Sequence, residues 1–188
     1  MDKDWYKPYD SPEELYVSWY LDELGEAEYL WSYDFQPVSF NLSLDVRYEW
    51  QQIMKTKTKS MSSALLQKHV YTPDFKVHWA DKSIGLFIKS IKFVTINKSA
   101  PFWINNSGES IWEVKPSFDR NNMTRLFTIN QKWVYDKYGI YVQKIIPWKL
   151  FAETFTPEKY LLTDSGKQKR KLIFTPRTLE EYVESRRG

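Results

Sequence analysis

The sequence predicts a single α/β domain, and three observations support this prediction. The chain has 188 residues, a length typical of one domain. Segments with apolar residues at alternate positions, as in strands, are interleaved with segments of helical spacing. Hydrophobic residues make up 42% of the chain, which is enough to build a core. Cysteine is absent, so that core is held without disulfides, and zinc–thiolate sites and thiol nucleophiles are excluded.

The first predicted element is a helix over 11–24. Ser11 is placed to cap it, Pro12 suits the first helical position, and Glu14 completes a capping box. Leucine and aromatic side chains follow at helical spacing, and Gly25 is a plausible end of the helix.

Strands are predicted from alternating apolar residues in the region that follows. The segment 36–44 alternates clearly, and 46–57 alternates more weakly, so both are predicted as strands. The Lys-, Ser- and Thr-rich stretch 55–63 is predicted as an exposed loop. A further strand covers 75–79. Pro73 belongs at its start because proline cannot donate to a strand ladder, and Asp74 follows it directly.

Strands, turns and two helices are predicted from residue 84 onward. We expect one or two strands in 84–96, turns in 97–109, and a strand at 110–115. A helix capped by Asp119 or Asn121 runs to Tyr138 and ends at Gly139, and a strand at 140–146 follows it. Thr178 caps a last helix over 179–186.

Two short pieces carry the residues suited to chemistry: Pro73-Asp74, and Glu113-Val114-Lys115 in a later strand. Glu113 and Lys115 are two apart, so on a strand they share a face. If the two strands are neighbours, Asp74 joins them. Phosphodiester hydrolysis needs such a set, because Mg²⁺ is held by one or two carboxylates with water and phosphate. A bound ion lowers the pKa of its water, and a nearby Lys can orient that water.

These residues resemble the motif of the PD-(D/E)XK nuclease superfamily, phage-type endonucleases included. The resemblance covers about 11–146 and implies a restriction-endonuclease-like core, a central mixed β-sheet flanked by helices. It implies that Asp74, Glu113 and the Val114 carbonyl hold Mg²⁺ or Mn²⁺, and that Lys115 positions the attacking water. Glu113 follows Asp74 by 39 positions, which is more than a simple hairpin needs, so we expect an inserted hairpin at about 81–108. A basic tail covers about 147–188.

The resemblance implies further site residues. Family members often carry a Glu in the first helix, and Glu14 matches it. Some branches carry a Gln-x-x-x-Tyr motif on the helix after the Lys, which Gln131 and Tyr135 fit. The tail contains a basic cluster that would contact DNA phosphates beside a nuclease site. This cluster consists of Lys167, Lys169, Arg170 and Lys171.

Each of these features also has a purely structural interpretation. Asp74 could cap a turn, Glu14 already serves the helix cap, and Gln131 with Tyr135 could be ordinary helix packing. Glu113 and Lys115 could form an exposed ion pair, although apolar neighbours suggest burial, and buried charges need a reason. The basic cluster could be a solvated patch.

The function expected from the sequence is metal-dependent cleavage of DNA, and an endonuclease is expected in preference to an exonuclease. Resemblance to small phage nucleases suggests replication, recombination or packaging in a host cytoplasm. The alternatives are a nucleic-acid-binding protein without catalysis and a phage structural or cargo protein. The net charge of +3 permits a nucleic-acid partner without demanding one. No signal peptide and no membrane span is expected, and a homodimer is compatible with the sequence.

Overall fold

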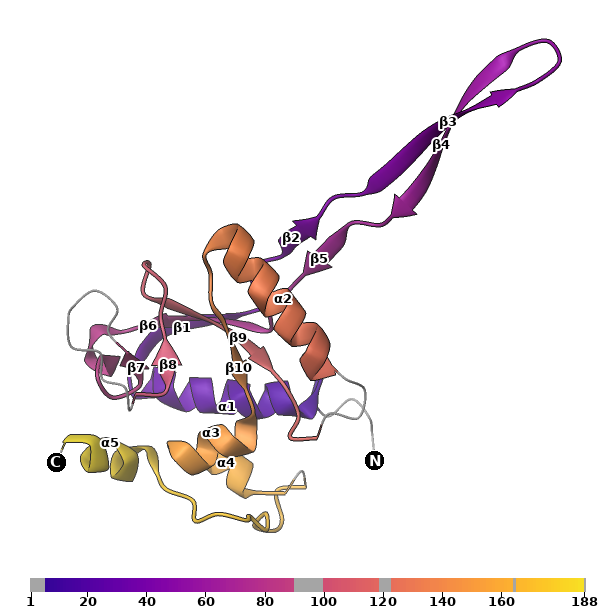
Figure 1. The fold of residues 1–188 in the computed structure, drawn as a ribbon. Coiled ribbons are helices and arrows are strands. Elements are labelled where there is room, and N and C mark those ends of the chain that lie inside the picture. Colours follow the sequence, from indigo (N-terminus) through magenta and orange to yellow (C-terminus); the bar gives the residue numbers. More distant parts are fainter. Residues whose placement is uncertain (1–5, 90–99, 119–122, 164, 188) are drawn as a thin grey trace.

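A four-stranded mixed sheet forms the centre of the protein (Figure 1). The computed structural model describes residues 6–89, 100–118, 123–163 and 165–187. In spatial order the strands are β1 (Leu30–Phe35), β6 (Phe75–Trp79), β9 (Glu109–Val114) and β10 (Val142–Ile145). β1, β6 and β9 are antiparallel neighbours, whereas β10 runs parallel to β9. The predicted α/β class, with a mixed sheet flanked by helices, is therefore confirmed.

Helix α1 (Pro12–Glu26) covers one face of the sheet, and its predicted cap is confirmed. The Ser11 side chain accepts a hydrogen bond from the Glu14 backbone N–H, and Ser11 Oγ donates to Glu14 Oε1 at 2.7 Å. The buried face of α1 joins the main hydrophobic core, which contains Trp112 and Val114 of β9. The register of β9 places these two side chains on the face opposite Ile111 and Glu113.

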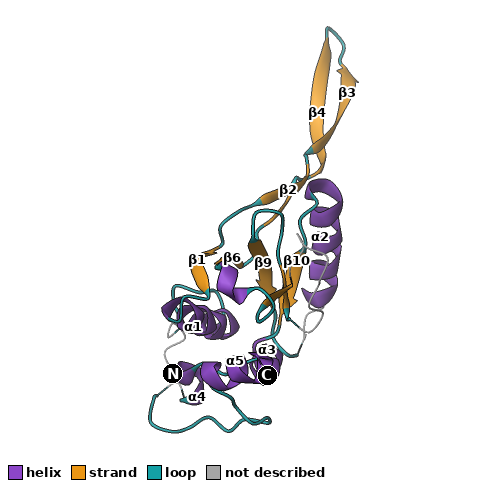
Figure 2. Cartoon of the chain, turned by 90° about the vertical axis from the view of Figure 1, so that its left-hand side faces the viewer, coloured by secondary structure: helices purple, strands orange, loops and turns teal. Residues whose placement is uncertain are grey.

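Helix α2 (Met123–Tyr138) lies across the other face of the sheet, as Figures 1 and 2 show. Phe127 and Val134 pack with Ile111 and Val142 in a second, smaller hydrophobic cluster. Gly139, at φ 67°, ends the helix as predicted, since a left-handed conformation favours glycine. The predicted caps Asp119 and Asn121 lie outside the described residues.

The C-terminal region contributes to the main core, which corrects the view of it as only a basic tail. Helices α3 (Pro147–Glu153) and α4 (Glu158–Leu161) follow β10, so Pro147 begins a helix as well as ending a strand. Helix α5 (Leu179–Arg187) places three apolar side chains in that core: Leu179, Tyr182 and Val183. Its predicted capping box is confirmed, because the Thr178 backbone N–H donates to Glu181 Oε2 and the Glu181 N–H donates to Thr178 Oγ1.

A long two-stranded arm projects from the body of the protein (Figures 1 and 2). It consists of β3 (Val46–Ile53) and β4 (Thr58–Leu66), paired antiparallel around a turn at 54–57. Its root is the short pair β2 (Phe40–Ser43) and β5 (His69–Tyr71). The predicted loop at 55–63 is wrong: most of that stretch is strand β4. Lys, Ser and Thr suit an exposed strand as well as a loop, and the sequence pattern does not separate the two.

The segment between β6 and β9 leaves the pairing of these two strands intact. It holds a 3₁₀ turn (Asp81–Ser83) and the two-residue strands β7 (Ile88–Lys89) and β8 (Phe102–Trp103). β7 and β8 pair in parallel, so they do not form the expected hairpin with each other. Residues 90–99 lie outside the described part of the chain. None of the helices described in the structure is long and apolar enough to cross a membrane.

Candidate active site

The pairing of β6 with β9 brings Asp74 beside the end of β9, although 39 positions separate Asp74 from Glu113 in the sequence. The Asp74 backbone N–H donates to the carbonyl of Trp112 at 3.0 Å. The Asp74 carboxylate accepts a hydrogen bond from the Val114 N–H, with Oδ2 at 2.6 Å from the nitrogen. The end of β9 therefore fixes both the backbone and the side chain of Asp74.

Glu113 and Lys115 point the same way, as their two-residue spacing predicts. Lys115 Nζ donates to Glu113 Oε1 at 2.5 Å, and the two side chains are only 13% and 9% exposed. Tyr71 Oη donates to the other carboxylate oxygen, Glu113 Oε2, at 2.8 Å. Both oxygens of Glu113 are thus engaged in a largely buried network, so the interpretation as an exposed ion pair is wrong.

Glu14 approaches the same cluster from the first turn of α1. It is buried, and it accepts hydrogen bonds from the Asp10 N–H and the Ser11 hydroxyl. The pKa of Asp74 is raised by burial and by Glu113, and the charge of Glu14 adds to this shift. Burial raises the pKa of Glu14 itself, and Lys115 opposes that shift. Glu14 therefore caps the helix and contributes negative charge to the cluster, so the two interpretations of this residue are compatible.

Burial, with repulsion from neighbouring carboxylates, shifts the pKa values of Asp74 and Glu14 upward. Burial raises the pKa of Asp74 to about 8, and the nearby charge of Glu113 is the second cause of this shift. The hydrogen bond from the Val114 N–H lowers the pKa of Asp74 and so opposes the shift. Burial also raises the pKa of Glu14. The pKa of the Tyr71 hydroxyl is raised by burial and by Glu113. The site holds three acids against one lysine, so a bound cation would relieve the repulsion between them.

The donor set fits a hard divalent cation that keeps most of its water. Asp74 and Glu113 supply carboxylate oxygens, and Mg²⁺ in proteins is commonly bound by one or two carboxylates together with water and phosphate. Among the described residues, no three His, Asp or Glu side chains are grouped closely enough to hold a metal by themselves. The ion would therefore depend on substrate and water oxygens for its remaining ligands. The Val114 carbonyl as a ligand stays a prediction.

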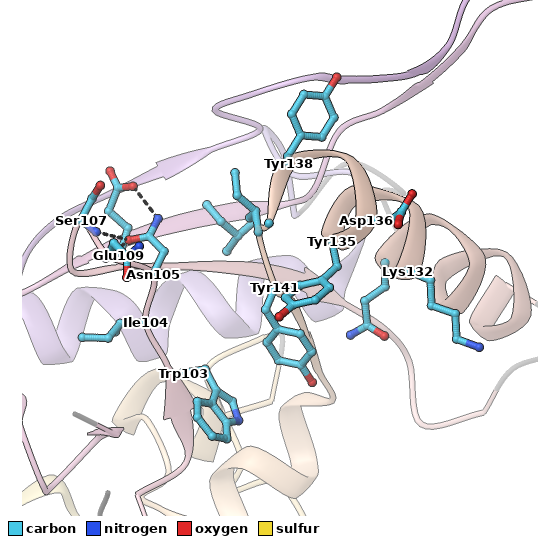
Figure 3. Close-up of a pocket in the computed structure, with 15 residues that line it drawn as sticks. Trp103, Ile104, Asn105, Ser107, Glu109, Lys132, Tyr135, Asp136, Tyr138 and Tyr141 are labelled. Carbon is cyan, nitrogen blue, oxygen red and sulfur yellow. Dashed lines mark hydrogen bonds between the residues drawn. The ribbon is translucent and has the colours of Figure 1, made fainter. Parts of the chain in front are cut away.

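Gln131 and Tyr135 lie along a separate groove (Figure 3). This groove, of about 1310 Å³, runs between α2 and the segment around Asn105, and its lining residues do not include Asp74, Glu113 or Lys115. Gln131 Nε2 donates to the carbonyl of Val142, which fixes α2 on the sheet edge. Tyr135 is exposed in the groove. The geometry therefore gives Gln131 a packing role and does not bring either residue to the carboxylates.

The predicted basic cluster is divided by the structure. Lys167, Lys169 and Lys171 are exposed on the loop between α4 and α5. Arg170 is only partly exposed: its Nε donates to the Tyr160 carbonyl, and its guanidinium lies 4.7 Å from the Tyr160 ring centre. Arg170 therefore holds this loop against the body, and the three lysines remain candidates for phosphate contact.

Tyr71 is the member of the site that the sequence analysis did not identify. It lies three positions before Asp74, in a strand of only three residues, which is too short to show a periodic pattern. The sequence does contain one indication, because a tyrosine three positions from a candidate acid can donate a hydrogen bond to a carboxylate of the site. Only the pairing of β5 with β2 and the packing on α2 show that Tyr71 reaches Glu113 instead of Asp74.

Comparison with known proteins adds no identification: the chain matches no protein-family model, no curated protein and no solved structure. The function is therefore argued from the site.

Proposed function

We propose that this protein is a metal-dependent deoxyribonuclease that hydrolyses DNA phosphodiester bonds with Mg²⁺ or Mn²⁺. The observation that supports it most is the convergence of Asp74, Glu113 and Lys115 at the end of β9, in a partly buried network. Burying charges costs free energy even when they are paired and hydrogen-bonded, so such a cluster is more often retained for function than for stability. This set has the residue types that metal-assisted phosphodiester hydrolysis requires.

Each residue has a distinct role in this proposal. Asp74 and Glu113 would hold the divalent ion, which supplies Lewis-acid stabilisation of phosphate charge and a water of lowered pKa. Lys115 hydrogen-bonds Glu113, and from that position it orients the attacking water and offsets negative charge on the phosphate. Tyr71 fixes the second oxygen of Glu113 and so keeps this carboxylate in one orientation. Glu14 adds negative charge that strengthens cation binding.

The order of elements gives independent support. Helix α1, the antiparallel strands β1, β6 and β9, helix α2 and then the parallel strand β10 follow one another around the sheet. The resemblance to PD-(D/E)XK nucleases implies a helix, a three-stranded meander, a helix on the sheet and a further strand, which is the same order. Asp74 directly precedes β6, the second of these antiparallel strands, and Glu113 lies in β9, the third, with Lys115 directly after it.

A cleavage assay tests the proposal. The purified protein is incubated with linear, circular and branched DNA, with Mg²⁺, Mn²⁺ or EDTA. We expect cleavage only with the metals. Asp74→Asn, which is nearly isosteric, should abolish it, whereas the control Asp34→Asn, on the exposed side of β1, should retain it. Cleavage by Asp74→Asn at the wild-type rate would refute the assignment. Absence of product on every substrate, with retained DNA binding, would favour the non-catalytic nucleic-acid-binding alternative.

A further inference from the structure

The projecting arm concentrates the net positive charge of the protein. Residues 46–66 contain four Lys and Arg and one Asp or Glu, a net charge of +3. The whole chain has 27 Lys and Arg against 24 Asp and Glu, so the other residues hold 23 of each and are neutral overall. The sequence from Trp50 to Pro73 contains no acid at all. Such an asymmetry favours a polyanionic partner for this segment.

The lysines gather at the far end of the arm. Lys55 and Lys57 lie in the turn, which the Met54 N–H closes by donating to the Lys57 carbonyl at 2.9 Å. Lys59 follows on β4, opposite Gln52. All three lysines are exposed. The tip therefore presents three cations within five residues, at the point of the arm that Figure 1 shows farthest from the sheet.

The shape of the arm suits a groove of duplex DNA. β3 and β4 form a two-stranded sheet of their own, and such a ribbon fits the major groove, which is about 12 Å wide. The eight residues of β3 span about 26 Å at roughly 3.3 Å per residue. That length corresponds to about eight base pairs of B-DNA at 3.4 Å each. One face of the ribbon carries Tyr48 and Trp50, with Met61 opposite Trp50, and these side chains are half exposed.

The root of the arm is attached next to the candidate active site. β5 ends at Tyr71, which donates to Glu113, and Asp74 follows three residues later. The root is also fixed to α2, because His69 hydrogen-bonds Asn130 at 2.9 Å and Lys137 donates to the Asn41 carbonyl at 2.7 Å. DNA held along the arm would therefore run from the tip towards the carboxylates.

We infer that the β3–β4 arm is a duplex-DNA-binding ribbon, which lies in a groove and contacts phosphates through Lys55, Lys57 and Lys59. The twelve positions from Lys59 to Tyr71 span about 40 Å at roughly 3.3 Å per residue, so these contacts lie about twelve base pairs from the active site. This role of the arm rests on the proposed nuclease function and adds the surface that would hold its DNA substrate. A second copy of this chain is the competing occupant, since Leu44, Leu65 and Leu66 near the root are exposed. Charge disfavours it, because two arms would bring +3 and +3 together and the remaining surface has no net negative charge.

Binding is measured in EDTA, where the duplex stays intact, so that this test is independent of catalysis. The variant Lys55→Gln/Lys57→Gln/Lys59→Gln is compared with Lys167→Gln/Lys169→Gln/Lys171→Gln, which removes the same charge from the α4–α5 loop. We expect the arm variant to lose tenfold or more in affinity. The slope of log K against log salt should become shallower by about 2.7, or about 0.9 for each phosphate contact. The loop variant should change much less.

A series of duplexes with shortened flanks provides the second measurement. Wild-type affinity should fall once fewer than about twelve base pairs remain on one side, and the arm variant should be insensitive to that length. Wild-type affinity together with an unchanged salt slope in the arm variant would overturn the inference. Sedimentation that shows a dimer, dissociated by Leu65→Ser/Leu66→Ser with duplex affinity retained, would also overturn it and assign the arm to a partner copy. Loss of binding in the arm variant without cleavage by any form of the protein would uphold this inference and refute the nuclease.

Discussion

The candidate active site and the arm place charge in opposite ways. At the site, Asp74, Glu113 and Lys115 are largely withdrawn from water and fixed by hydrogen bonds from neighbouring strands. In the arm, the lysines of the tip are exposed and the ribbon forms a separate two-stranded sheet. Buried charges of this kind interact strongly and depend on exact geometry, whereas exposed ones act over several ångströms and are screened by salt. The first arrangement suits chemistry, and the second suits attraction of a polyanion.

The two regions also differ in what holds them in shape. The site inherits its geometry from the four-stranded sheet, with hydrophobic clusters on both faces. The arm is held together by the pairing of β3 with β4. Among the described residues, no side chain of β3 or β4 belongs to either hydrophobic cluster. An isolated hairpin is marginally stable in water. We therefore expect changes at the site to alter rate and stability together, and changes in the arm to alter binding alone.

The largest effect is expected from removing the site lysine. Lys115→Met preserves length and should lower the cleavage rate by about 10²–10⁴-fold, because a group that orients the water and offsets charge is lost. The matched control is Lys149→Met, at an exposed position of α3, which should cleave normally. Initial rates at saturating Mg²⁺ measure both. A wild-type rate for Lys115→Met would separate the lysine from the chemistry and leave it as a structural partner of Glu113.

Two tryptophans sharpen the contrast in stability. Trp112 on β9 is fully buried, and Trp50 on β3 is 41% exposed. Trp112→Ala should lower the free energy of unfolding by about 3–5 kcal/mol, as large core truncations do. Trp50→Ala should change it by less than about 1 kcal/mol. Urea unfolding measures both. A loss at Trp50 as large as that at Trp112 would show that the arm packs against something in solution, which is the signature of a partner copy.

Titration of Asp74 should make the free energy of unfolding depend on pH through the site and not through the arm. The Asp74 pKa is about 8 in the folded protein, against about 3.9 in an unfolded chain. Between these values the folded state binds more protons, so the free energy of unfolding falls as pH rises from about 4 to about 8 and levels off above. Each pH unit contributes at most about 1.4 kcal/mol. Asp74→Asn should lack this loss and become more stable than wild type as pH rises.

Denaturant unfolding at pH 5 and pH 8 measures this effect, with Asp34→Asn as the control. Saturating Mg²⁺ at pH 8 should stabilise wild type, because the ion binds the ionised carboxylate, and should have little effect on Asp74→Asn. An identical pH dependence in wild type and Asp74→Asn would show that Asp74 is ionised and well solvated in the folded protein. It would also remove the repulsion that favours a bound cation.

The sequence predicts the site better than it predicts the arm, for physical reasons. Capping boxes, the proline before Asp74 and the spacing of Glu113 and Lys115 are local signals, and the structure confirms the placement that they imply. The arm has no comparable local signal in its sequence. Strand β4 is largely exposed, and its sequence lacks a regular alternation of apolar residues. The turn at 54–57 contains no Gly, Pro, Asn or Asp to mark it. Strand β1, which was not predicted, likewise depends on pairing with β6.

Local sequence patterns do not predict which distant segments contact each other. Tyr71 reaches Glu113 only because β5 pairs with β2 and both pack on α2. Gln131 and Tyr135 have the spacing of a family motif, yet the rotation of α2 turns them towards the groove of Figure 3. A spacing of four on a helix defines a face without saying what that face meets.

The smallest effect compares the two capping boxes of the chain. Glu14 in α1 is buried beside the site, and Glu181 in α5 is exposed at the other end of the molecule. Glu181→Gln keeps an oxygen that can accept from the Thr178 N–H, and Glu14→Gln keeps one of the two oxygens that accept from the Asp10 N–H and the Ser11 hydroxyl. Each substitution should therefore change the free energy of unfolding by about 1 kcal/mol or less.

Their effects on cleavage should differ, because only Glu14 adds charge near Asp74. Glu14→Gln should raise the Mg²⁺ concentration needed for half-maximal cleavage by several-fold, whereas Glu181→Gln should leave it unchanged. Titration of the cleavage rate with Mg²⁺ measures this shift. If the two variants respond alike, Glu14 is a helix cap that lies beside the site without belonging to it. The negative charge that holds the ion would then come from Asp74 and Glu113 alone, both of them positioned by the end of β9.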